Sequence, residues 1–358
     1  MNNGVITYGF GREYLQNWKL KEALREVYQN FMDYGDYKEE IKRVQTRNGV
    51  VLNVTLFNTY SPKDLSFLRI GNSNKGNNLQ AIGKHGEGLK MAAMIFKRED
   101  MYFEINAACN LVLPVFKDIE HLGECFAFEY TQHEFNPIMF IVSFDIVERI
   151  FEDFKSGILT PENHKVIYEC KEYGKIIDRN EGQIYVGGIF VCAVTGLQHA
   201  YDFNPSHVHL DRDRAVPSAF DVNFSAGQIL MQYMKHKDSK VKAVHLNYND
   251  YQYVHTLPSH IKENITPTIV GKDVVFVATD KDEATGKETQ VIISNHSVKE
   301  AIKKDSFFTK VIRKLKETLL KGLGVYELME QFRAKHLAGY PEMEQDFDII
   351  MQKYQSEQ

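Results

Sequence analysis

The stretch IGKHGEGLKMAAMIF, from Ile82 to Phe96, places three glycines directly before a run of residues with helical character. Glycine allows positive φ angles and lets the backbone approach a ligand without a Cβ in between. The first turn of a helix carries unpaired N–H groups and the positive end of the helix dipole, which together attract phosphate. The stretch therefore has two interpretations: an ordinary loop that starts a helix, or a cradle for the phosphates of a nucleotide.

The composition is that of a folded globular protein without a strong overall preference for polyanions. The chain has 358 residues, 43% hydrophobic and 25% charged, with a net charge of −5, and this length is sufficient for two domains. Its four cysteines are widely spaced and form no CxxC pair, which predicts free thiols rather than a zinc site or disulfides. Neither a charged-then-apolar leader nor an apolar run of membrane length is present, so we expect a cytoplasmic protein without a membrane partner.

Residues 18–34 are predicted to form an amphipathic helix. Apolar residues at helical spacing predict a buried stripe: Leu20, Leu24, Val27 and Phe31. A second stripe of the same helix is polar: Glu22, Glu26, Asn30 and Asp33. This polar stripe is either the solvated side of the helix, or a site where a carboxylate acts as general base beside an amide oxygen that holds Mg²⁺.

The rest of the chain alternates strand-like and helical segments. In the first block we expect strands at 50–58, 65–70, 101–108, 110–116, 125–131 and 138–145, and a short helix at 146–155. After GILTPEN (157–163) we expect strands at 165–170, 183–194, 243–248, 273–279 and 289–294, and a helix at about 218–236. From Val298 onward the sequence is helical. The order predicts an α+β fold divided into residues 1–158, 159–296 and 297–358.

A loop rich in asparagine and glycine follows the predicted strand that ends at Ile70. Within it, Asn72 precedes Gly76, and an amide at this place can donate to or accept from the edge of a base. Asparagine and glycine are also favoured in plain strand-to-loop turns. The loop alone does not decide between a base-binding site and a plain turn.

The order of the three segments resembles that of the GHKL superfamily of ATPases. REVYQNFMD (25–33) resembles the N box of that superfamily, RIGNSNKG (69–76) its first glycine box and GKHGEGLK (83–90) its second. The superfamily includes gyrase-type topoisomerases, heat-shock chaperones, histidine kinases, MutL-type repair proteins and MORC proteins, and the second glycine box is most similar to that of MORC-like members. The resemblance covers roughly residues 14–155. It implies a Bergerat-type α/β sandwich, followed by a smaller, transducer-like mixed α/β domain and C-terminal helices.

The resemblance also implies ATP and Mg²⁺ as cofactors and a role for each matching residue. Glu26 would activate the hydrolytic water, Asn30 would bind Mg²⁺, and Asp33 would lie beside the nucleotide. The segment from Asn74 to Ile82 would form the nucleotide lid. The other implied nucleotide-binding residues are Asn72, Gly76, Gly83, Lys84, Gly86, Gly88, Leu89 and Lys90.

One box departs from the pattern of the superfamily. Asn72 stands where these ATPases usually have an aspartate that accepts a hydrogen bond from the adenine amino group, and Asn74 replaces a glycine. An asparagine oxygen can accept the same hydrogen bond, but its NH₂ group can also face a keto group. Specificity for adenine therefore stays open.

Two further patterns could bind a partner. Along a predicted strand, four metal-ligand types alternate: His207, His209, Asp211 and Asp213. They form either a polar sheet face opposite Arg212 and Arg214 or a metal site, and either arginine is also a candidate contact to a γ-phosphate. The helical segment 299–321 is basic, with Lys310, Arg313, Lys314 and Lys321 on one side; this side is either solvated or a contact to nucleic acid or to an acidic protein.

These observations leave three functional hypotheses. The first is Mg²⁺-dependent ATP binding and hydrolysis that drive a conformational switch of the lid and of a homodimer. The second is a degenerate module that binds nucleotide without hydrolysis, or that docks to a protein or nucleic-acid partner. The third is a nucleic-acid clamp that uses the basic segment 299–321.

Overall fold

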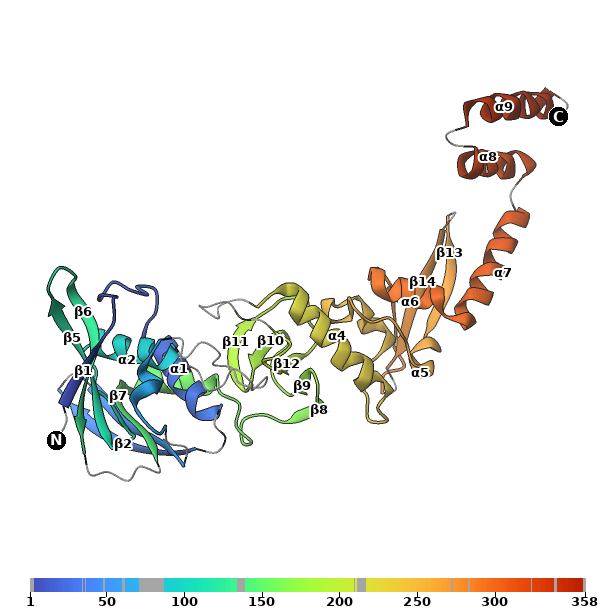
Figure 1. The fold of residues 1–358 in the computed structure, drawn as a ribbon. Helices are drawn as coiled ribbons and strands as arrows, with labels where there is room; N and C mark the ends of the chain where they lie inside the picture. Colours follow the sequence, from blue (N-terminus) through green and yellow to red (C-terminus); the bar gives the residue numbers. More distant parts are fainter. Residues whose placement is uncertain are drawn as a thin grey trace. The chain divides into compact units, whose positions relative to one another are not determined.

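The computed structural model describes residues 3–33, 35, 37–47, 49–59, 62–70, 87–133, 139–208, 210, 217–271, 273–282, 284–322, 324–337 and 340–356. By internal packing the chain divides into two units (Figure 1). The first comprises Met1–Thr195 and His199–Ser225, and the second comprises Gly196–Gln198 and Ala226–Gln358. Each unit has its own sheets and is described separately.

A seven-stranded sheet forms the centre of the N-terminal half of the first unit. Its strand order is β1-β6-β5-β4-β7-β3-β2, and each described pair of neighbours is antiparallel. The strands are β1 (Asn3–Thr7), β2 (Lys38–Thr46), β3 (Gly49–Asn58), β4 (Phe103–Ala107), β5 (Asn110–Ile119), β6 (Gly123–Gln132) and β7 (Phe140–Val147). Side chains alternate between the two faces of such strands, and the buried face of β7 carries Phe140, Val142, Phe144 and Ile146.

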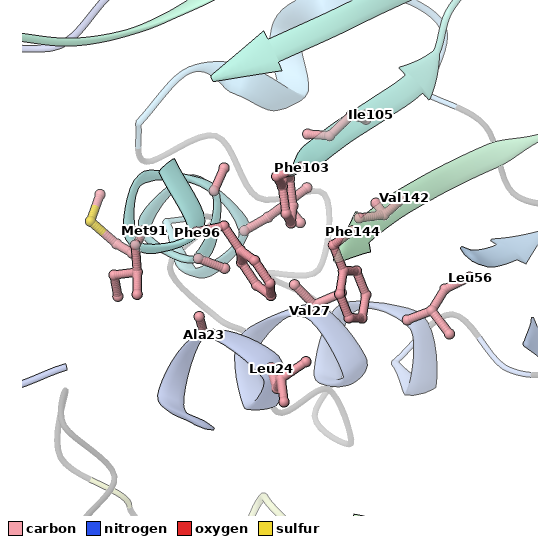
Figure 2. Packing of buried hydrophobic residues seen from close by; sticks show 14 of the residues in the cluster. Ala23, Leu24, Val27, Leu56, Met91, Phe96, Phe103, Ile105, Val142 and Phe144 are labelled. Atoms are coloured by element: carbon pink, nitrogen blue, oxygen red, sulfur yellow. The ribbon is translucent and has the colours of Figure 1, made fainter. Parts of the chain in front are cut away.

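Three helices accompany this sheet: α1 (Leu20–Met32), α2 (Gly88–Arg98) and α3 (Glu148–Ser156). Figure 2 shows α1 and α2 together against the sheet, with Phe96 of α2 directed at Phe103 and Phe144. The ring centroid of Phe96 lies 5.1 Å from each of these two rings. The predicted apolar stripe of α1 is buried, which confirms the helix and its orientation: Leu20, Leu24, Val27 and Phe31.

A five-stranded sheet completes the first unit, in the order β11-β10-β12-β9-β8. Its strands are β8 (Val166–Cys170), β9 (Gly174–Ile177), β10 (Gln183–Val186), β11 (Ile189–Ala193) and β12 (Ala200–Phe203). β10 and β12 are parallel, and the other neighbours are antiparallel.

The second unit is built on the three-stranded antiparallel sheet β13-β14-β15. The strands are β13 (Ile265–Val270), β14 (Asp273–Lys281) and β15 (Glu288–Ile292). The helical elements from Ala219 onward are α4 (Ala219–Lys235), η2 (Ala243–Asn247), η3 (Asn249–Tyr251), α5 (Ser259–Lys262), α6 (His296–Lys304), α7 (Ser306–Gly322), α8 (Val325–His336) and α9 (Pro341–Ser356). The unit packs its sheet against α7, where Phe308 meets Phe276 edge to face at 6.5 Å between ring centroids.

The α+β class is confirmed, but three of the predicted strands are wrong. Residues 65–68 form the 3₁₀ helix η1 (Leu65–Leu68), because the carboxylate of Asp64 accepts a hydrogen bond from the backbone N–H of Ser66 at 2.8 Å and starts a turn. Residues 243–247 form the 3₁₀ helix η2, whose last residue, Asn247, hydrogen-bonds through its side chain to the backbone beyond β15. The predicted strand 183–194 is the hairpin β10–β11, which turns at Gly187 and Gly188 with positive φ.

The side-chain predictions have mixed outcomes. All four cysteines are free thiols, as predicted. His207 lies in a turn rather than on a strand, whereas His209, Asp211, Arg212, Asp213 and Arg214 lie outside the described residues. The described residues contain no group of three His, Cys, Asp or Glu side chains arranged to hold a metal ion. Among the helices that the structure describes, none has both the length and the apolar character needed to cross a membrane.

Truncation of Phe144 to alanine should destabilise the first unit by about 3–5 kcal/mol, because this fully buried ring contacts Phe96 and its removal leaves a cavity. The free energy of unfolding measured in urea is the test. Ile41→Ala, at a site that is 46% exposed on β2, is the matched control and should cost less than about 1 kcal/mol. Equal effects of the two substitutions would contradict the assigned core.

Candidate functional site

Glu26 is buried within α1 rather than exposed on its polar side. Its residue surface is 3% exposed, and Arg25 Nε lies 3.8 Å from Glu26 Oε1. One turn later, Asn30 Nδ2 donates a hydrogen bond to the backbone oxygen of Glu26 at 2.7 Å. The interpretation of this stripe as a simple solvated face is therefore wrong at Glu26, because this side chain is buried beside Arg25. Asp33 follows the last residue of α1 and is half-buried.

The carboxylate of Glu26 lies against the first residue of α2. A Cβ added to Gly88 would be 2.0 Å from Glu26 Oε2, so no side chain other than hydrogen fits at this position unless the carboxylate moves. Gly88 is the first residue of α2, where backbone N–H groups and the helix dipole favour negative charge. The structure thus brings together the segment that resembles an N box and the end of the segment that resembles a second glycine box.

Lys90 is the second unusual charged group at this helix start. It is only 2% exposed, and burial lowers the pKa of its ammonium group to about 8, while the charge of Glu87 acts in the opposite direction. A lysine buried in the first turn of a helix is suited to an anion, which would stabilise its charged form. Leu89 beside it is also buried and packs into the core under α2.

The remaining predicted nucleotide-binding residues fall outside the described part of the chain: Asn72, Gly76, Gly83, Lys84 and Gly86. Of the predicted set, the structure describes Glu26, Asn30 and Asp33 at α1, and Gly88, Leu89 and Lys90 at the start of α2. These two helices contact one another, so both described motifs belong to one region of the first unit.

Sequence reasoning missed two polar residues of this unit. Arg25 lies beside Glu26, and its guanidinium carbon is 5.9 Å from the centre of the Trp18 ring. Asn58 is 5% exposed at the end of β3, and its side-chain amide makes no hydrogen bond to the described residues. A buried amide of this kind is costly unless water or a ligand satisfies it. The only signal for Asn58 was a polar residue at the end of a strand that is mostly apolar.

The chemistry of the described side chains fits a nucleotide and Mg²⁺. Mg²⁺ prefers oxygen ligands, and because Asn30 donates through Nδ2, its oxygen is the end that would hold the ion. Lys90 and the N-terminus of α2 would supply positive charge for phosphates, and Glu26 would supply a carboxylate for proton transfer.

No protein-family model matches the chain, and no curated protein matches it in sequence. Two crystal structures of the ATPase region of Saccharomyces cerevisiae topoisomerase II, one of them bound to ICRF-187 (dexrazoxane), are similar to it at a TM-score of 0.31. The similarity extends over 48% of this chain at 12% sequence identity and spans 62% of the topoisomerase region. A likeness this distant carries no argument about function, which must come from the residues of this chain.

Gly88→Ala should destabilise the first unit by about 1–3 kcal/mol, since its methyl group would overlap Glu26 Oε2. The three heavy atoms nearest to such a Cβ all belong to Glu26, so Glu26→Ala in the same chain should recover most of the loss. Thermal or urea unfolding of the two single variants and the double variant measures this coupling. Gly9→Ala, where a Cβ meets nothing within 4 Å, should be nearly neutral. Additive effects at Gly88 and Glu26 would contradict the contact.

The buried Lys90 should make stability rise with pH in the alkaline range. Its pKa is about 8 in the folded protein and close to the ordinary 10.5 in the unfolded chain, so between these values the unfolded state binds more protons. Relative to Lys90→Met, the wild type should therefore gain about 3 kcal/mol of unfolding free energy from pH 7 to pH 11. Parallel pH profiles for the two proteins would show that Lys90 is not buried.

Proposed function

We propose that the protein binds ATP with Mg²⁺ in the first unit and hydrolyses it, as a GHKL-type ATPase. One observation carries this proposal: the buried Glu26 carboxylate lies against Gly88, at a helix start that also buries Lys90. The order of the three motifs in the sequence supports the same assignment. We further propose that residues 1–158 hold the nucleotide and that residues 159–296 act as a transducer-like domain ahead of the helical segment 297–358.

Each described site residue has its own proposed role in hydrolysis. Glu26 would accept the proton of the attacking water, which makes the water a better nucleophile toward the γ-phosphate. Asn30 would hold Mg²⁺, and the ion would neutralise charge on the phosphate oxygens. Lys90 and the N-terminus of α2 would bind the phosphates. The proposed product of the cycle is a conformational switch.

A second candidate function is nucleotide binding without turnover. It is favoured by Asn72 and Asn74, which stand in the first glycine box where an aspartate and a glycine are usual. In that case the bound nucleotide acts as a ligand switch, and the protein works by docking. Exposed cations on α7, at Lys310, Arg313 and Lys314, would then be a contact to an acidic protein surface.

Calorimetric titration and a turnover assay test the proposal together. Wild type should bind a non-hydrolysable ATP analogue in the presence of Mg²⁺, and Lys90→Met should weaken this binding by about tenfold or more, because it removes a charge-assisted phosphate contact. Glu26→Gln should retain binding but lose about 100-fold or more of the turnover. Parallel titrations with a GTP analogue show whether Asn72 preserves the preference for adenine.

Glu22→Gln is the matched control for turnover. Glu22 lies one turn before Glu26 on the same helix, and its carboxylate accepts a hydrogen bond from the backbone N–H of Lys19 at 2.8 Å. Its substitution should leave turnover within about threefold of wild type. Binding with equal background turnover in wild type and Glu26→Gln would establish the non-hydrolysing alternative, whereas the absence of binding to either analogue would refute both functions.

A further inference from the structure

The last two helices of the second unit form a hairpin that uses only part of its apolar surface. Phe332 of α8 stacks on Phe347 of α9 with ring centroids 5.8 Å apart, and Arg333 pairs with Asp348 at 3.1 Å. Met351, on the same side of α9 as Phe347, is 5% exposed. This side of α9 is therefore the one that packs within its own chain.

A second apolar stripe of α9 is exposed. Its large apolar side chains are Met343 at 56%, Ile349 at 61% and Ile350 at 55% exposure. Glu342 and Asp346 are exposed on the same side, at helical spacing from these residues. We call these five residues the α9 outer stripe. A helix that is apolar on two sides is ordinarily covered on both sides. We therefore expect another protein surface to cover the α9 outer stripe.

The exposed side of α7 has the opposite charge. Phe308 is buried and contacts Phe276 of the sheet. Phe307, by contrast, is 59% exposed and is followed by three exposed cations at helical spacing. We call Phe307, Lys310, Arg313 and Lys314 the α7 outer stripe. Over their full lengths α7 carries five Lys/Arg and one Glu, net +4, and α9 carries four acids and one Lys, net −3.

We propose that a second copy of this chain covers both stripes, with α9 of each copy docked on α7 of the other. The two stripes are complementary, since each combines exposed apolar side chains with charges of opposite sign. If a two-fold axis relates the two copies, the contact between α9 and α7 forms twice, as an isologous dimer requires. Nucleic acid is a poorer occupant, because it would cover only α7 and would be repelled by α9. The contact needs no nucleotide and does not depend on the proposed ATPase function.

Charge reversal provides a test that also separates a reciprocal dimer from pairing within one chain. Variant A carries Glu342→Lys and Asp346→Lys, and variant B carries Lys310→Glu, Arg313→Glu and Lys314→Glu. Each variant repels its own copies, but α9 of A matches α7 of B, and α7 of A matches α9 of B. The full chain is measured by sedimentation equilibrium and light scattering without nucleotide. The control is Glu120→Lys with Asp238→Lys, whose native side chains are 90% and 73% exposed.

The wild type and the control should be dimers, and variants A and B alone should each dissociate at least about tenfold more readily. An equimolar mixture of A and B should form a heterodimer with nearly the affinity of the wild type. Circular dichroism of A and B confirms that both are folded, and recovery in the mixture is independent evidence of folding. A monomeric wild type, or a mixture that stays monomeric, would overturn the proposal, and both results can be read whether or not the protein binds ATP.

Discussion

The contact between Glu26 and Gly88 is the constraint on which the first unit depends. The carboxylate occupies the space that a Cβ at position 88 would need, so with this carboxylate position only glycine fits at the start of α2. The start of α2 also gives the buried charge favourable backbone dipoles. Lys90, two residues further along α2, is buried in the same first turn of the helix.

The polar groups of the candidate site lie in the same unit as a buried aromatic core, and their burial lowers the stability of that unit. Phe96, Phe103 and Phe144 bury large aromatic area beneath α2, whereas Glu26, Lys90 and Asn58 bury polar groups in the same unit. Proteins commonly place such unfavourable groups where a ligand will satisfy them. An aromatic core beside polar groups is thus what a preorganised anion site requires, because the rigid neighbours hold the charges in place without the ligand.

Local patterns predicted the parts of the fold that depend on periodicity alone. The apolar spacing of α1 and the alternation along β7 each bury one side, so they were visible in the sequence. The edge strand β2 was missed, because its mostly exposed residues carry no apolar alternation, and η1 was missed because Asp64 starts a turn in an apolar run. The motif order indicated Glu26 and Gly88 as site residues, but the burial of Glu26 and of Asn58 depends on tertiary contacts that no local pattern contains.

The charges that the two proposals use lie in different environments. In the first unit Glu26 and Lys90 are buried at α1 and α2, where we propose a ligand site, whereas α7 and α9 of the second unit expose the charges of the proposed dimer contact. A dimer held through α7 and α9 would keep two nucleotide sites at a high effective concentration whether or not they are occupied. ATP would then need to supply only the free energy of rearranging two tethered copies. For that task a first glycine box of modest nucleotide affinity, with asparagine at position 72, would be sufficient.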